Sequence, residues 1–205
     1  MRERQTRAAV TILVACAVAA ALVVVAPAGA TEDSRRDARL QPERVMDAIG
    51  IRPGMVVGEA GAGRGYFTFK LARRVGPSGK VYANDIDRSA LDDLRQVCRD
   101  EKIGNVETVV GEVEDPLFPV AGLEVVVMVY AIHDFARPVA FLGNLKKYLK
   151  PGGTVVVLDQ DPDASGDRHF LTRERLVALF AESGYELARD ERILEKDLLL
   201  VFRPS

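Results

Sequence analysis

The sequence predicts an α/β protein built on a doubly wound, mostly parallel sheet. Short apolar runs alternate with stretches of roughly 10–15 residues in which apolar side chains recur at helical spacing, which is the order of βαβ units. One run, 123–130 (LEVVVMVY), is apolar nearly throughout, as in a strand buried on both faces of a parallel sheet. We therefore expect right-handed crossovers and place this strand at the centre of the sheet.

Residues 1–30 are expected to stand apart from this folded domain. Three arginines open the chain, residues 8–26 carry no charge, and Ala28-Gly29-Ala30 is a small-x-small cleavage pattern. These features predict a secretory signal peptide, and hence a periplasmic or extracellular protein. The uncharged run is also about the ~20 residues of a membrane-spanning helix, so an uncleaved membrane anchor is the alternative. Arginines on both sides of the run leave the orientation of an anchor open, a cytoplasmic-facing domain included.

The domain itself is expected to span 42–205, after a charged, aperiodic linker at 31–41. Its first helix, 42–49, begins with proline in the first turn and ends at Gly50. The short apolar run 55–57 is then the first strand. Further along, apolar residues at helical spacing predict helices at 66–75, 88–102 and 137–149, and apolar runs predict strands at 80–85, 106–110 and 123–130.

The C-terminal part follows the same alternation. Lys150-Pro151-Gly152-Gly153 breaks the preceding helix and turns the chain into a buried strand at 154–159. Thr172 is expected to cap a helix that reaches Glu182 and that Gly184 closes. Two more strands are predicted near 185–193 and 198–203.

Composition fits one domain with a substantial core and argues against a nucleic-acid partner. The chain has 205 residues, 48% of them apolar. The first thirty residues hold three Arg and one Glu, which leaves 25 basic and 29 acidic residues in the rest. That mildly acidic body lacks the concentrated positive face that binding a phosphate backbone needs. We therefore expect no nucleic-acid partner. The 175 residues after residue 30 leave no room for a separate substrate domain, so a small-molecule partner is expected, while the oligomeric state is left open.

Cysteines and histidines predict neither a disulfide framework nor a metal centre. Cys16 lies in the N-terminal segment, so Cys98 is alone in the domain. Leu13–Cys16 is similar to a lipoprotein box, but ten further apolar residues follow where a mature lipoprotein turns polar. No group of these residues has the sequence spacing of metal ligands, so no metal is expected.

Residues 59–67 (EAGAGRGYF) form a glycine-rich loop between the first strand and the next helix. Such a loop lets the backbone approach a ligand closely, and the helix behind it presents free N–H groups to an anion. The dinucleotide fingerprint needs glycine at the position of Tyr66, so the spacing disfavours NAD and a nicotinamide-dependent reductase. Asp85, at the end of the second strand, can accept hydrogen bonds from ribose hydroxyls, whereas Asp87 is expected to cap the following helix.

Over residues 42–203 these motifs resemble those of class I S-adenosylmethionine-dependent methyltransferases. The resemblance implies S-adenosylmethionine as the cofactor and a Rossmann-like sheet of seven strands that is mostly parallel, with an antiparallel C-terminal strand. The segments that carry it are VVGEAGAGRGYFTFKLA (56–72), GKVYANDID (79–87), GEVEDPLFP (111–119), VVVMVYAIHDF (125–135) and LKPGGTVVVLD (149–159).

The resemblance also implies which residues bind the cofactor. In that family the glycine loop holds the methionine moiety, the acid that ends the second strand holds the ribose, and the loop after the third strand flanks the adenine. Carried over with adjoining positions, the cofactor-binding set is Glu59, Gly61, Ala62, Gly63, Gly65, Tyr66, Asp85, Ile86, Glu112, Val113 and Tyr130.

A catalytic role is less sharply indicated. His133 lies just beyond the central strand and is a candidate general base for a hydroxyl acceptor, with anchoring of a neighbouring loop as the alternative. His169, before the Thr172 helix, is expected at the surface, with a place in the same crevice as His133 as the alternative. The acceptor site is expected to be built from residues 42–49, 111–122 and 160–171.

We therefore expect an S-adenosylmethionine-dependent methyltransferase with a small-molecule acceptor that the sequence does not identify. The fourth strand's motif opens with Glu124, and no Asn/Asp-Pro-Pro-aromatic run follows Tyr130, which disfavours N-methylation of nucleobases or glutamine. The alternative is a non-catalytic ligand-binding protein with the same fold, because export would separate the domain from cytoplasmic S-adenosylmethionine.

Overall fold

The computed structural model describes residues 28–205. The predicted signal peptide or anchor therefore lies almost entirely outside the described residues. Within 28–205, no helix combines the length and apolar character that crossing a membrane requires.

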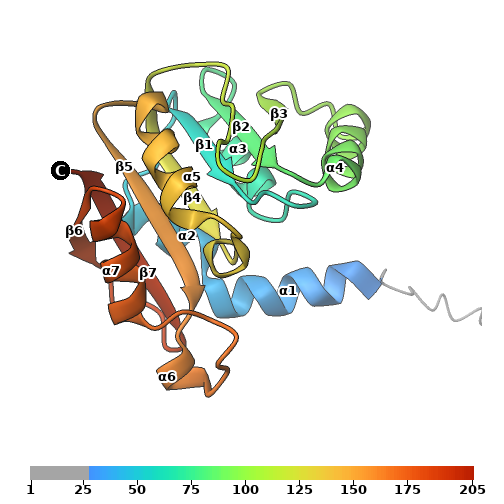
Figure 1. Ribbon diagram of the computed structural model, residues 1–205. Coiled ribbons are helices and arrows are strands. Elements are labelled where there is room, and N and C mark those ends of the chain that lie inside the picture. Colours follow the sequence, from blue (N-terminus) through green and yellow to red (C-terminus); the bar gives the residue numbers. More distant parts are fainter. Residues whose placement is uncertain (1–27) are drawn as a thin grey trace, which may run out of the picture.

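One seven-stranded sheet organises the described chain, in the order β3-β2-β1-β4-β5-β7-β6 (Figure 1). Strands β1 to β5 run parallel, and β7 pairs antiparallel with both β5 and β6. The predicted seven-stranded sheet with an antiparallel end is confirmed, as is the central place of the LEVVVMVY strand. The strands are β1 Val56–Ala60, β2 Lys80–Asp85, β3 Val106–Val110, β4 Leu123–Val129, β5 Leu149–Gln160, β6 Tyr185–Asp190 and β7 Asp197–Pro204.

Helices cover both faces of the sheet. Side chains of β4 alternate between two apolar clusters, Val126 and Met128 in one and Val125 and Val127 in the other. The first cluster also takes residues of α5 and α7, and the second takes residues of α2 and α3. The helices are α1 Ala28–Leu40, α2 Pro42–Ala48, α3 Thr68–Val75, α4 Arg88–Asp100, α5 Pro138–Leu145, α6 Pro162–Ser165 and α7 Arg173–Glu182, with 3-10 turns η1 Ile132–Asp134 and η2 Lys146–Tyr148.

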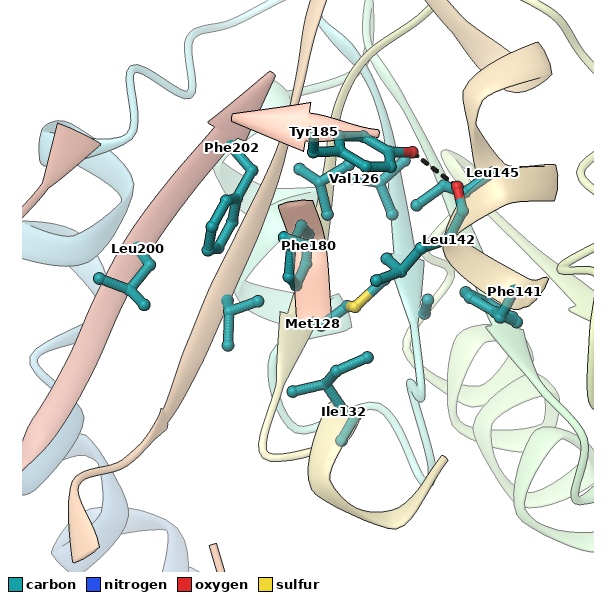
Figure 2. Close-up of a cluster of buried hydrophobic side chains, with 14 of the residues drawn as sticks. Val126, Met128, Ile132, Phe141, Leu142, Leu145, Phe180, Tyr185, Leu200 and Phe202 are labelled. Carbon is teal, nitrogen blue, oxygen red and sulfur yellow. Dashed lines mark hydrogen bonds between the residues drawn. The ribbon is translucent and has the colours of Figure 1, made fainter. Parts of the chain in front are cut away.

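Figure 2 shows how the first cluster joins helices to the C-terminal strands. The rings of Phe180 and Phe202 stack with centroids 3.7 Å apart, which locks α7 onto β7. The Tyr185 hydroxyl donates to the Leu142 carbonyl at 2.8 Å, so that β6 is tied to α5 by a satisfied buried hydrogen bond (Figure 2).

Three segments differ from the sequence prediction. Residues 31–41 are not a structureless linker, because most of them belong to α1. Pro-Gly-Gly after Lys150 lies inside β5 rather than before it, since the pairing of β4 with β5 begins at Leu149 and then shifts register. The predicted loop 160–171 contains the short helix α6, whose first turn Asp161 caps by accepting from the Asp163 N–H.

Candidate functional site

The three loop glycines are required for three different reasons. All have positive φ, which favours glycine. A Cβ on Gly61 would lie 2.4 Å from the Cβ of Ala131, so glycine lets the loop pass against the end of β4. A Cβ on Gly65 would press at 2.9–3.0 Å on Phe69 and Leu94 in α3 and α4. A Cβ on Gly63 would meet no protein atom within 4 Å, so it would project into open space.

Glu59 enters this loop as a buried carboxyl at the end of β1. Its side chain is nearly inaccessible to solvent, and the hydroxyl of Thr68 donates to it at 2.5 Å. Burial raises the pKa of Glu59 to about 8, despite the hydrogen bond from Thr68. A carboxyl in this state loses its proton readily when a cation binds beside it, because the cation offsets the free-energy cost of burying the negative charge.

Asp85 ties the glycine loop to the end of β2. One oxygen accepts from the Gly63 N–H at 2.8 Å and the other from the Asp87 N–H at 2.9 Å. Asp87 accepts from the N–H groups of Ser89 and Ala90 and so caps α4, as predicted. Each carboxylate oxygen of Asp85 still has acceptor capacity for a ligand.

Two cavities flank the loop and share a single lining residue, Gly61. The larger cavity has a volume of about 590 Å³. Of the predicted cofactor-binding residues, it is lined by Glu59, Ala62, Gly63, Tyr66 and Tyr130. The smaller cavity, of about 100 Å³, is lined by Asp85, Ile86, Glu112 and Val113 of the same set. Every predicted cofactor-binding residue except Gly65 therefore lines one of them, and Gly65 instead packs against helices.

Helix α1 closes the larger cavity from one side with residues that the sequence did not single out. Figure 1 shows α1 across the end of the sheet to which the β5 arrow points. Arg35, Arg36 and Arg39 line the cavity. Arg39 donates to Asp197 at 2.7 Å and to Gln160 at 2.7 Å. It also donates to the hydroxyl of Tyr130.

A second set of polar contacts joins α1 to the glycine loop and α3. Asp37 accepts from the Tyr66 hydroxyl at 2.7 Å and pairs with Lys70 at 2.6 Å. The guanidinium of Arg36 lies 4.5 Å from the centre of the Tyr66 ring, a cation–π contact. Helix α1 therefore docks largely through charged and hydrogen-bonded groups, and Leu40 adds one buried apolar anchor.

His133 lies in η1, directly after β4, and lines neither cavity. Its Nδ1 is 2.7 Å from a carboxylate oxygen of Asp159, which is fully buried in β5. Burial alone would lower the pKa of His133, but the Asp159 carboxylate outweighs that effect, so the pKa lies above its ordinary value. Phe170 covers the ring at a centroid distance of 4.4 Å.

The expected acceptor segments contribute unequally. Phe170, within 160–171, packs edge-on against Tyr130 of the larger cavity and thus belongs to its surroundings. The segment 111–122 supplies Glu112 and Val113 to the smaller cavity. Helix α2 lines neither cavity, because its apolar side chains are used in the core; α1 takes the place expected for it.

In sequence, the chain is similar to known methyltransferases. A family model described as a methyltransferase domain matches residues 51–194. The ubiquinone/menaquinone biosynthesis C-methyltransferase UbiE of Shewanella pealeana is 32% identical over 122 residues, which are 59% of this chain and 49% of that protein. The chain thus spans about half the length of the curated relatives it matches.

Solved structures show the same fold. A SAM dependent methyltransferase from Aquifex aeolicus superimposes with a TM-score of 0.75 at 20% identity, covering 84% of this chain and 96% of that one. The [4+2]-cyclase SpnF superimposes with a TM-score of 0.65 at 15% identity, covering 76% of this chain and 60% of that one. Since a protein named as a cyclase shares the fold, the fold by itself does not determine the reaction.

Proposed function

The chain belongs to the class I S-adenosylmethionine-dependent methyltransferase family, and from this premise we propose that it methylates a small-molecule acceptor. The cofactor of this family is S-adenosylmethionine. The observation that carries the proposal is the pair of cavities that meet at Gly61, because together they gather all but one of the residues expected to bind that cofactor.

The residues present fit the chemical parts of the cofactor. The larger cavity combines the buried acid Glu59 with arginines of α1, which suits an amino-acid group carrying both charges. The smaller cavity presents the exposed apolar side chains of Ile86 and Val113, which suit the faces of a flat base. Asp85 lies at its edge with acceptor capacity for hydroxyl groups.

Bound S-adenosylmethionine supplies an activated methyl group on a sulfonium. The protein's own contribution is then to position the acceptor against the methyl group and to exclude water. An in-line displacement is accelerated most by holding the acceptor atom and the methyl carbon close and aligned. Tyr66 and Tyr130 narrow the larger cavity, and α1 closes it. Tyr130 is held there at φ 54°, a backbone conformation that is uncommon for a side chain of its size.

A small acceptor is supported by the size of the larger cavity and by the relatives. The larger cavity, of about 590 Å³, has to hold the amino-acid group of the cofactor together with the acceptor, which favours a small acceptor. The relatives are named as C-methyltransferases of ubiquinone and menaquinone biosynthesis, which supports an acceptor of low molecular weight. Which atom of the acceptor receives the methyl group is left to experiment.

Calorimetric titration of the purified chain with S-adenosylmethionine, S-adenosylhomocysteine and NAD tests the cofactor assignment. We expect both S-adenosyl compounds to bind and NAD to give no heat of binding. Methyl transfer is then followed by mass spectrometry on a panel of quinols, phenols and amines. Binding without turnover on any acceptor would favour the ligand-binding alternative, and failure of both S-adenosyl compounds to bind would reject the proposal.

Neighbouring aspartates provide a matched pair of variants for the same titration. Asp85→Ala should weaken cofactor binding by roughly 1.5–3 kcal/mol, the scale of hydrogen bonds to a charged acceptor. Asp87→Ala should leave binding nearly unchanged and lower the free energy of unfolding by about 0.5–2 kcal/mol through loss of the α4 cap. The reverse order of effects would move the ribose contact to Asp87.

A further inference from the structure

The chain has two histidines, and the fold brings them together. The rings of His133 and His169 lie edge to face, with centroids 4.9 Å apart. Between them, Asp134 directs one carboxylate oxygen at His133 Nε2, at 3.5 Å, and the other at His169 Nε2, at 3.3 Å. The sequence leaves open whether His169 enters the same crevice as His133, because the two histidines belong to segments far apart in the chain.

We propose that His133, Asp134 and His169 form a binding site for a divalent transition-metal ion. Their ligand atoms all lie within 4.8 Å of one another. Around an ion with bonds of about 2.1 Å, adjacent ligand atoms are about 3.0–3.4 Å apart. The two separations from Asp134 are measured from its two different oxygens, and each is close to that range. Rotation of the exposed Asp134 and His169 side chains can therefore bring one ligand atom from each of the three residues to a single ion.

Asp159 provides the supporting contact that a histidine ligand needs. Its buried carboxylate lies 2.7 Å from Nδ1 of His133, which makes Nδ1 the protonated nitrogen and leaves Nε2 with a free lone pair. Ligating histidines almost always donate their other N–H to a carboxylate or carbonyl in this way. The ring of His133 is therefore fixed with its ligating nitrogen toward Asp134 and His169.

Exposure decides how such an ion would be held. The side chain of His133 is 5% exposed, whereas those of Asp134 and His169 are 67% and 59% exposed. One rigid ligand and two accessible ones leave the remaining coordination positions open to water. Two imidazoles and one carboxylate suit Zn²⁺, Co²⁺, Mn²⁺ or Fe²⁺, while Mg²⁺ and Ca²⁺ prefer oxygen ligands alone.

This site adjoins the smaller cofactor cavity, because Asp134 also lines that cavity. It does not depend on the proposed methyl transfer. It does change the role of His133, because a nitrogen that ligates a metal cannot also accept a proton. A metal at Nε2 therefore replaces the general-base role that the sequence suggested.

Zinc binding to the tag-free, chelator-stripped full-length chain tests the proposal by calorimetry. We expect one equivalent of Zn²⁺ to bind, unaffected by millimolar Mg²⁺. His169→Ala and Asp134→Asn should each weaken binding at least about tenfold, and Asp159→Asn by about 10–100-fold. Since His169 and Asp134 are exposed, thermal melts of their variants should match that of the wild type.

Asp163→Asn is the matched control, because Asp163 is an exposed carboxylate in the same region outside the cluster. It should bind zinc as the wild type does, and Co²⁺ should give visible absorption bands in both but not in His169→Ala. Absence of zinc binding to the wild type, or equal binding by the wild type and His169→Ala, would overturn the proposal. Either result would leave the cofactor titrations, and hence the proposed function, unaffected.

Discussion

Gly63 and Gly50 have the same kind of backbone conformation but different surroundings. Both have positive φ, and a Cβ on either would meet no protein atom within 4 Å. Only Gly63 lines the larger cavity. Gly63→Val should therefore abolish cofactor binding in a folded protein, at a cost in stability of about 1–2 kcal/mol from the left-handed backbone. Gly50→Val should cost similar stability and leave binding intact, as measured by calorimetry and urea unfolding.

A different result is expected for Gly61, two residues earlier in the glycine-rich loop. Gly61→Ala should lower stability as well as binding, because its Cβ would overlap Ala131 and the backbone would have to move. Full cofactor affinity in a folded Gly63→Val protein would contradict the placement of the ligand.

Glu59 should make the stability of the ligand-free protein depend on pH. Its carboxyl has a pKa of about 8 in the folded protein and about 4.5 when unfolded. Below pH ~4.5 both states hold the proton; as pH rises toward 8 only the unfolded state releases it, so stability falls over that window. With about 1.4 kcal/mol per pKa unit, the free energy of unfolding should fall between pH 5 and 8 by on the order of 3 kcal/mol more in the wild type than in Glu59→Gln.

Urea unfolding at the two pH values measures this difference. Glu195→Gln, which changes an exposed glutamate, is the control and should keep the pH dependence of the wild type. Identical pH dependence in the wild type and Glu59→Gln would show that the buried carboxyl is not the cause.

At the scale of elements, α1 is held to the domain by a few polar side chains, and Arg39 makes most of the contacts to Tyr130, Gln160 and Asp197. Arg39→Ala should release the helix, because the buried Asp197 then loses its cation. We expect amide hydrogen exchange across 32–40 to accelerate, while the body of the domain loses only about 1–3 kcal/mol.

Arg35→Ala is the matched control, since Arg35 is exposed one turn earlier on the same helix. It should leave exchange across 32–40 unchanged. Equal protection of α1 in the wild type and Arg39→Ala would mean that Leu40 and the Asp37 contacts suffice to hold the helix.

Helix α1 also shows which elements can be predicted from the sequence and which cannot. The sequence predicts strands such as Lys80–Asp85 and Val106–Val110 at their observed bounds, because apolar runs and the glycines that interrupt them are local signals. Among residues 32–40 of α1, only Leu40 is a buried apolar anchor, and the polar partners of the helix lie far along the chain, so no periodicity marks it. His169 beside Asp134 is a long-range meeting of the same kind.

At the scale of the whole molecule, we expect the first thirty residues to direct the location of the domain. The sequence predicts export or outward display, so a reporter that is active only outside the cytoplasm should be active when fused after Ser205, an exposed residue beyond β7. Sizing the fusion product should show the loss of about thirty residues if the signal peptide is cleaved. A chain lacking residues 8–26 is the control and should give a silent fusion. A silent, full-length product from the complete chain would reject export.

The position of Gly61 between the two cavities has a consequence for affinity. A ligand that fills both sides is a tethered pair of fragments, and once one fragment is seated the other is present at an effective concentration of the millimolar order. Adenosine and methionine added separately would each bind weakly, even at saturation of the other. The covalent link in one molecule would convert two weak associations into a tight one without any new contact to the protein.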